Sequence, residues 1–162
     1  MSSILKVDTI QNTGGTTGLT IDSSGRILTS TNRPAFFATL NASITSTTAG
    51  AGIVYSATSL NQGSHYSTST GKFTAPVAGL YWFGTSVLTD MDGTDGYCGL
   101  SLLKNGTVIA RDQAYSYLDN DVTLQINIVI SLAASNYITI TSNRAVYGSA
   151  DGYTHFSGYL IG

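Results

Sequence analysis

The sequence of 162 residues predicts an all-β protein, a sandwich, barrel or jelly roll of short antiparallel strands. All nine acidic residues are Asp, and the lack of Glu disfavours helices because Glu is a good helix former whereas Asp favours turns. Several segments alternate apolar and polar residues with the period of two of a half-buried strand, and no segment keeps a helical period. Ser, Thr, Gly and Tyr are abundant, as is typical of strands and turns.

Charge and cysteine content disfavour several other classes of protein. Charged residues make up only 10% of the chain and the net charge is −2, without a basic cluster, so no nucleic-acid partner is expected. Cys98 is the single cysteine, so no disulfide within the chain is expected. No apolar run approaches the ~18 residues of a membrane span, and the first residues lack the pattern of a secretory signal, so no membrane partner is expected.

Residues 1–33 differ in composition from the rest of the chain. They are polar and are interrupted by glycines at Gly14, Gly15, Gly18 and Gly25. Their few apolar pairs predict brief strands but are too few to build a core, because burial must outweigh the entropy lost on ordering. We expect this segment to become ordered only against other copies or a larger assembly.

From residue 34 onward, the sequence predicts a succession of β-strands. The clearest is 122–132, in which six apolar residues share one face: Val122, Leu124, Ile126, Ile128, Ile130 and Leu132. Asn105 and Gly106 lie between apolar flanks and predict a type I′ hairpin, because both residue types accept a positive φ. Further strands are predicted within residues 52–60, 137–143 and 155–162.

An aromatic strand follows residues 71–79 and contains the only tryptophan. Leu80 and Trp82 fall on one face of this strand, and Tyr81 and Phe83 fall on the other. A strand with large apolar groups on both faces is covered on both sides, and in a single small sandwich only one face meets the core. We therefore expect a second chain to cover the other face, and the pattern leaves open which face that is.

Four stretches in this order resemble the globular head of the complement 1q family, which shares its jelly roll with tumour necrosis factor: Pro34–Leu40, Tyr66–Phe83, Leu102–Ala110 and Phe156–Ile161. The resemblance covers residues 34–162. It implies a jelly-roll sandwich of ten strands in two sheets, assembled as a homotrimer around a threefold axis. Ser135 and Asn136 stand where the family usually has Gly-Asp before a late strand, which leaves the geometry of that turn open.

Residues 5–28 are similar to the opening segments of fibre and appendage proteins of tailed bacteriophages. The resemblance implies that residues 1–33 anchor the chain to a virion through other virion proteins and help it to oligomerise. Residues 34–162 would then form the exposed head, and the protein would be located on the particle surface or tail.

The motifs of common enzymes are missing from the sequence. It contains no Gly-x-Ser-x-Gly elbow for a nucleophilic serine and no evident carboxylate pair for glycoside hydrolysis. The two histidines, His65 and His155, do not have the spacing of metal ligands. We therefore expect a protein that is not an enzyme.

Three carboxylates within six positions form the one candidate metal site, at Asp90, Asp92 and Asp95. Several carboxylates on a tight, glycine-containing loop suit calcium, although the loop lacks the spacing of a helix–loop–helix calcium site. The alternative is a solvated turn in which Asp accepts hydrogen bonds from its own backbone. No other cofactor is expected.

Two clusters of tyrosine and aspartate are the candidate ligand-binding residues: Tyr115, Tyr117, Asp119 and Asp121, then Tyr147, Asp151 and Tyr153. Tyrosine rings cover the apolar faces of sugars, and acidic groups accept hydrogen bonds from sugar hydroxyls. The alternative is that these tyrosines pack at strand ends or between subunits.

Together these features predict a homotrimeric structural protein of a bacteriophage virion, such as a short tail fibre, knob or surface appendage. Its head would attach to a host surface glycan or protein, and three weak sites on one head would bind a repetitive surface by avidity. The alternatives are a capsid or tail decoration protein without a receptor, and a bacterial lectin-like module.

Overall fold

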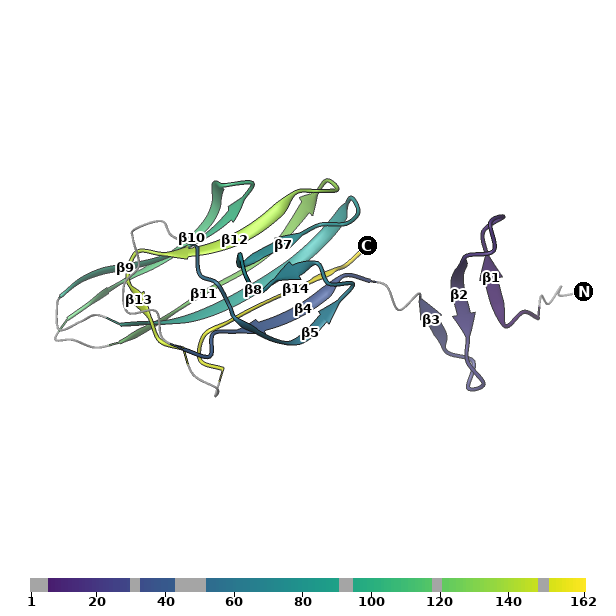
Figure 1. The fold of residues 1–162 in the computed structure, drawn as a ribbon, viewed down its shortest axis with the longest axis horizontal. Helices are drawn as coiled ribbons and strands as arrows, with labels where there is room; N and C mark the ends of the chain where they lie inside the picture. Colours follow the sequence, from purple (N-terminus) through teal and green to yellow (C-terminus); the bar gives the residue numbers. More distant parts are fainter. Residues whose placement is uncertain (1–5, 30–32, 43–51, 91–94, 118–120, 149–151) are drawn as a thin grey trace, which may run out of the picture. The chain divides into compact units, whose positions relative to one another are not determined.

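The computed structural model describes residues 6–29, 33–42, 52–90, 95–117, 121–148 and 152–162 (Figure 1). The chain divides into two compact units, residues 1–33 and residues 34–162, which we call the N-terminal unit and the head. Every regular element in the described ranges is a β-strand. Among the described residues, no helix is long and apolar enough to cross a membrane.

The N-terminal unit is a three-stranded antiparallel sheet in the order β1 (Thr9–Gln11), β2 (Thr17–Ile21) and β3 (Ile27–Thr29). None of the side chains from Lys6 to Arg26 is buried, and Ile10 is largely exposed. The side chains from Lys6 to Arg26 therefore form no hydrophobic core of their own, consistent with the few apolar residues among them.

Two similar turns join these three strands. In each turn the Oδ1 atom of Asn12 or Asp22 accepts hydrogen bonds of 2.9–3.0 Å from the backbone N–H groups two and four residues later. A glycine three residues after each of these side chains, Gly15 or Gly25, has a positive φ of 80° or 77°. The short polar side chains thus replace backbone hydrogen bonds and set the hairpins locally.

The head is a sandwich of two antiparallel sheets, as predicted. The first sheet has the order β10 (Thr107–Ser116), β9 (Gly96–Lys104), β12 (Tyr137–Ser142), β7 (Lys72–Thr74), β6 (Tyr66–Ser67). The second has the order β11 (Val122–Leu132), β8 (Gly79–Asp90), β14 (His155–Leu160), β4 (Ala35–Thr39), β5 (Ala57–Gln62), with the short β13 (Ala145–Val146) also paired to β8. Figure 1 shows β9, β10 and β12 on one side of the head and β4, β5 and β14 on the other.

The turns and strands of the head can be compared with those predicted from the sequence. Asn105 and Gly106 have φ values of 51° and 82°, which confirms the predicted hairpin between β9 and β10. Ser135, in the turn before β12, has a φ of 69°, so a serine takes the left-handed conformation there. The strand predicted within residues 52–60 begins later, at Ala57, and before it only Gly52 forms an isolated bridge.

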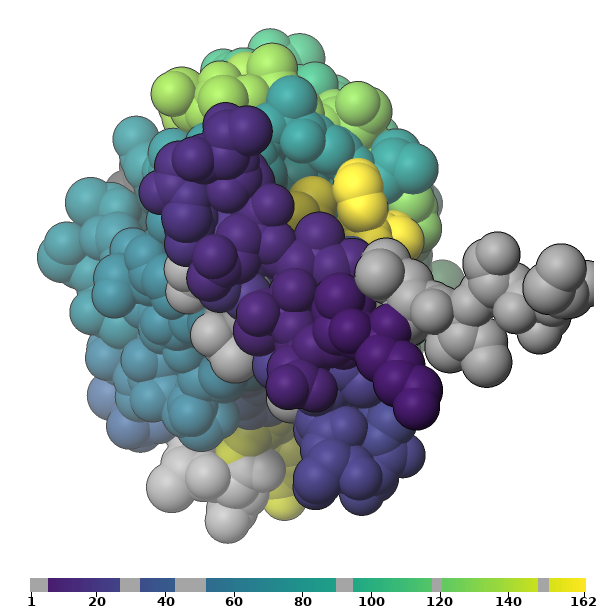
Figure 2. Space-filling model, turned by 90° about the vertical axis from the view of Figure 1, so that its right-hand side faces the viewer, coloured from purple at the N-terminus to yellow at the C-terminus, as the bar shows by residue number. Residues whose placement is uncertain are grey.

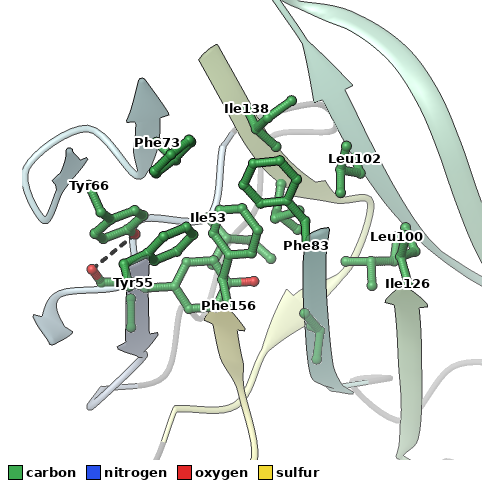
Figure 3. Close-up of a cluster of buried hydrophobic side chains, with 14 of the residues drawn as sticks. Ile53, Tyr55, Tyr66, Phe73, Phe83, Leu100, Leu102, Ile126, Ile138 and Phe156 are labelled. Carbon is green, nitrogen blue, oxygen red and sulfur yellow. Dashed lines mark hydrogen bonds between the residues drawn. The ribbon is translucent and has the colours of Figure 1, made fainter. Parts of the chain in front are cut away.

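Aromatic rings contributed by distant parts of the chain fill the space between the sheets (Figure 3). Phe36 stacks on Tyr66 with 4.9 Å between ring centroids and meets the edge of Phe156 at 4.8 Å. Phe73 and Phe83 complete the cluster at 5.3 Å from each other. All five rings are nearly or completely buried, so the sandwich closes around them.

Two of the buried tyrosines satisfy their hydroxyl groups within the core. The hydroxyl of Tyr66 donates to the carbonyl of Tyr55 at 3.2 Å (Figure 3). The Tyr55 hydroxyl lies 3.0 Å from the hydroxyl of Thr85. Burial raises the pKa of both tyrosines well above the ordinary value, because it penalises the charged phenolate. Both groups therefore remain neutral donors at physiological pH.

The structure resolves which face of the aromatic strand meets the core. Tyr81 and Phe83 on β8 point inward and are fully buried, whereas Trp82 and Leu80 lie on the outer face of the second sheet. The Trp82 ring folds over Gly84, where a side chain would collide with it. The outward aromatic group is thus held flat against the sheet.

Candidate functional site

A groove with a volume of about 320 Å³ crosses the outer face of the first sheet, over β10, β9 and the end of β12. The side chains of β9 alternate, so that Cys98 and Leu100 point into the core while Gly99 and Ser101 face outward. Because Gly99 has no side chain, the sheet is hollow at this point. The groove therefore begins at a gap in the sheet surface.

Gly99 is not required by the backbone at this position. Its φ lies outside the left-handed region, and an added Cβ atom would make only an ordinary contact, 3.5 Å from the Oδ1 atom of Asn143. The residue opposite Gly99 on β10 is Gln113, whose side chain forms another wall. The glycine thus provides space on the surface rather than a special turn.

Asn143 forms the wall beyond the end of β12 and is fixed in place. Its Oδ1 atom accepts a 2.6 Å hydrogen bond from the backbone N–H of Gly99, and its Nδ2 atom donates to the carbonyl of Tyr97 at 3.4 Å. The Nε atom of Arg144 donates to the same carbonyl at 3.1 Å. These contacts hold one side of the groove before any ligand arrives.

Three tyrosines cluster beside the groove. Tyr97 on β9 stands opposite Tyr115 on β10, with ring centroids 4.8 Å apart and planes at 88°, and Tyr117 follows at 4.5 Å from Tyr115. The rings are 61%, 42% and 65% exposed respectively, so much of their aromatic surface faces solvent. Such rings combine apolar faces with polar hydroxyls.

Arg111 supplies positive charge within the groove, between Gln113 and Val108 on β10. It stands opposite Ser101 on the outer face and is exposed. Within the described ranges no ion pair involves Arg111. The carboxylate of the neighbouring Asp112 turns towards β11, where it accepts a 2.9 Å hydrogen bond from the backbone N–H of Gln125.

Two residues of the first predicted tyrosine cluster flank the groove without lining it. Tyr115 and Tyr117 lie beside it, whereas Asp121 is an exposed residue just before β11 and Asp119 lies outside the described residues. The sequence analysis missed Gly99, Arg111 and Asn143, which line the groove, and Tyr97, which lies beside it. The alternation of side chains along β9 and β10 could have indicated which residues face outward together. The pairing of the two strands, however, depends on a bulge between Val108 and Ala110 that the sequence pattern does not reveal.

The second predicted cluster does not line the groove. The backbone N–H of Tyr147 donates to the carbonyl of Leu88 at 2.9 Å, and Tyr147 is half-buried. Tyr153 is 58% exposed, and Asp151 lies outside the described residues. A ligand-binding role for this cluster stays a prediction.

The calcium prediction also remains untested. Asp90 ends β8, Asp95 is exposed before β9, and Asp92 lies outside the described residues. Over the residues that the structure describes, no three His, Cys, Asp or Glu side chains gather to hold a metal ion.

The outer face of the second sheet is of a different kind. A row of residues runs across four paired strands, from Ala35 through Tyr159 and Trp82 to Val129. The rings of Tyr159 and Trp82 lie 5.5 Å apart, and Tyr159 and Val129 are 47% and 56% exposed. Leu80 adds to this row at 48% exposure. We call this row and Leu80 the apolar face.

The chain ends beside this apolar face. The backbone N–H of Leu80 donates to the carbonyl of Gly162 at 2.8 Å, and that of Leu160 donates to the carbonyl of Pro34 at 3.0 Å. In Figure 2 the C-terminal residues are coloured yellow. The head thus begins and ends at one end of the sandwich.

Two five-stranded paths that close over an aromatic core define a jelly-roll module, and the outer face of its first sheet carries a groove. The chain belongs to the C1q domain family, whose model matches residues 35–161. Domains of this family are non-enzymatic binding or structural modules and typically form homotrimers.

Individual relatives agree with this assignment. Complement C1q tumor necrosis factor-related protein 3 of Homo sapiens is 28% identical over 111 residues, which is 68% of this chain and 44% of the relative. Caprin-2 of Danio rerio is 28% identical over 130 residues, 80% of this chain and 14% of the relative. The chain therefore spans less than half the length of these relatives.

Solved structures share the fold. The globular domain of zebrafish complement 1qA protein superposes with a TM-score of 0.64 at 17% identity, covering 80% of this chain and 98% of that domain. The Eiger TNF structure from S. frugiperda gives a TM-score of 0.66 at 10% identity, covering 81% and 94% of the two chains.

Proposed function

We propose that the protein is a homotrimeric binding head that attaches an assembly to a repetitive surface. The apolar face of the second sheet carries the contact between subunits, and the groove on the first sheet faces outward to the ligand. The observation that carries this proposal is the contrast between the two outer faces of one sandwich.

The apolar face has the composition of a subunit interface. Trp82, Tyr159, Val129 and Leu80 form a contiguous, partly exposed patch, and such patches mark interaction surfaces. Aromatic residues are enriched at interface cores and charged residues are depleted there. Between Leu80 and Leu88 the outward residues of β8, and those opposite them on β14, β4 and β11, include no Asp, Lys or Arg.

The absence of charge on this described face suits self-association. Around a threefold axis each subunit presents the same face to its neighbours, so like charges there would repel one another. A trimer built in this way leaves the opposite sheet, with its groove and tyrosines, open to solvent. Three grooves on one rigid head increase the apparent affinity for a repetitive surface by avidity.

The setting of this head is proposed to be a bacteriophage virion, on a short tail fibre, knob or surface appendage. The support is the resemblance of residues 5–28 to phage appendage proteins, together with an N-terminal unit that buries no described side chain and so needs a partner to cover it. The relatives named above are animal proteins, so the virion setting rests on this segment alone.

The mass of the purified full-length protein in solution tests the trimer. A species of three chains supports the proposal, and a monomer at all concentrations contradicts it. The same measurement with a calcium chelator tests whether a metal ion is needed for the trimer, and loss of the trimer on chelation would support the predicted calcium loop.

A second experiment tests attachment against pure decoration. The full-length trimer is added to host cells before infection, and adsorption of particles is counted. Reduced adsorption supports a receptor-binding head, whereas unchanged adsorption favours a capsid or tail decoration protein.

A further inference from the structure

We propose that the groove on the first sheet binds an anionic sugar, with the Arg111 guanidinium on the sugar's acidic group and the three tyrosines against its ring. This inference rests on the proposed function, since it names the ligand class of the same binding head. It goes further in assigning a charge to the ligand and roles to Arg111 and to the tyrosines beside the groove.

The size of the groove suits a small saccharide unit. Its volume of about 320 Å³ lies at the lower end of the roughly 300–1,000 Å³ of small-ligand sites. An open groove on a sheet, unlike an enclosed pocket, admits a chain that continues in both directions. The site therefore fits one or two residues within a longer glycan.

The tyrosine end provides the stacking surface. Tyr97 and Tyr115 meet edge to face at 88°, so the two ring planes cannot both lie flat on the sheet. With Tyr117 they form a corner of rings whose faces are partly open to solvent. The C–H face of a pyranose buries apolar surface against such rings while its hydroxyls stay in water.

The part of the groove next to the tyrosines provides hydrogen-bonding groups around a hollow. The space above Gly99 is bordered by Gln113, Asn143 and Ser101, each of which has polar side-chain atoms. Asn143 is already oriented by its bond to the Gly99 N–H, so little rotamer entropy is lost there on binding. Sugar hydroxyls both donate and accept, which matches amide and hydroxyl groups.

The Arg111 side chain decides the charge of the ligand. Arg111 lies on the same outer face as Gln113 and Tyr115, at positions two and four residues before them on β10. Its guanidinium forms no ion pair with a described residue, and the adjacent Asp112 is engaged with the backbone of β11. An unpaired guanidinium offers two parallel N–H donors that match an oxyanion.

A carboxylate on a uronic acid and a sulfate ester both present such an oxyanion, and the test separates them. Full-length protein is titrated in a calorimeter, at physiological salt, with oligogalacturonate, with its methyl ester and with a sulfated galactan oligosaccharide of equal length. The methyl ester keeps the same sugar ring and removes only the charge. Preference for oligogalacturonate or for the sulfated oligosaccharide over the ester supports the proposal and identifies the group.

Three variants locate the site. Arg111→Gln is expected to weaken binding of the preferred acidic oligosaccharide by about tenfold or more, with little effect on the ester. Gly99→Val fills the hollow and is expected to weaken both ligands. Lys72→Gln removes the same charge from β7 of the same sheet, outside the groove, and is expected to change nothing.

The outcomes separate this inference from the function on which it rests. Equal binding of the ester and the acid, or equal effects of Arg111→Gln and Lys72→Gln, overturns the anionic ligand. No binding of any oligosaccharide by an intact trimer that still blocks particle adsorption overturns the sugar as well and leaves the binding head standing. A protein that is monomeric and does not affect adsorption overturns the proposed function itself.

Discussion

The two outer faces of the head are built from the same alternation of strand residues, yet they present opposite chemistry. On the second sheet, outward positions of β8 and its neighbours carry Trp82, Tyr159 and Val129 without any intervening charge. On the first sheet, outward positions of β9 and β10 carry Arg111 and Gln113 around a glycine.

Under the proposed function, this difference separates assembly from recognition within one sandwich. A face that self-associates benefits from apolar area without repelling charges, whereas a face that selects a ligand needs polar groups held in fixed positions. Because the aromatic core lies between the sheets, each face can change without altering the other. The predictions that follow test that separation.

The largest effect is expected from a charge placed on the apolar face. Val129→Lys introduces three like charges near one another in a trimer and should reduce the mass in solution to that of one chain. The matched control, Thr139→Lys, places the same charge on the outer face of β12 in the first sheet and should leave the trimer intact. Equal outcomes for the two variants, measured by light scattering, would remove the distinction between the faces.

The next effect separates two adjacent rings on β8. Phe83→Ala empties part of the core and should lower the free energy of unfolding by about 3–5 kcal/mol, measured by urea denaturation. Trp82→Ala removes an outward ring and should instead weaken trimer association, by about 2 kcal/mol or more if this ring is an interface hot spot. A larger loss of chain stability from Trp82→Ala than from Phe83→Ala would contradict the orientation of β8.

A pH effect is expected from the core rather than from either face. Burial raises the pKa of Tyr55 and Tyr66, so the folded state holds their protons more tightly than the unfolded state does. The contribution of these two tyrosines to the free energy of unfolding is complete below the unfolded pKa of about 10, and it is lost as the pH rises above that value. Urea denaturation between pH 9 and pH 11 should show falling stability, with a shallower fall in Tyr66→Phe; an unchanged slope in that variant would exclude Tyr66 as a source.

The smallest effect compares two glycines. Gly99→Ala meets only an ordinary contact and should leave stability unchanged or raise it by about 0.4–1 kcal/mol, because alanine restricts the unfolded chain. Gly158→Ala should destabilise the head, because its methyl group would collide with the rings of Phe83 and Phe36. Thermal unfolding distinguishes them, and a clear loss of stability in Gly99→Ala would mean that the fold, not a ligand, requires this glycine.

Local patterns in the sequence determined much of the fold. The apolar alternation along β11 predicted its buried face, and Leu124, Ile126 and Leu132 are buried as expected. Asn105 and Gly106 predicted the β9–β10 hairpin, because a type I′ turn is specified by the two residues that form it. Such features depend on neighbouring residues alone, so they can be read without the rest of the chain.

The candidate site depended on a feature that local patterns do not reveal. Starting from the turn, Lys104 pairs with Thr107, and an unbroken register would place Tyr97 opposite Ala114. A bulge between Val108 and Ala110 shifts the register by one residue and places Tyr97 opposite Tyr115 instead. Because side chains alternate with a period of two, this single shift moves a whole set of β10 side chains to the other face.

The tertiary structure also decided which face of β8 is buried. Both faces carry large apolar groups, so alternation alone could not choose between Trp82 and Phe83. Phe83 is inside because Phe36, Phe73 and Phe156, from three other strands, pack around it. The sequence by itself determined the strands and their turns, whereas contacts between residues far apart in the chain decided which side chains the two outer faces of the sandwich expose.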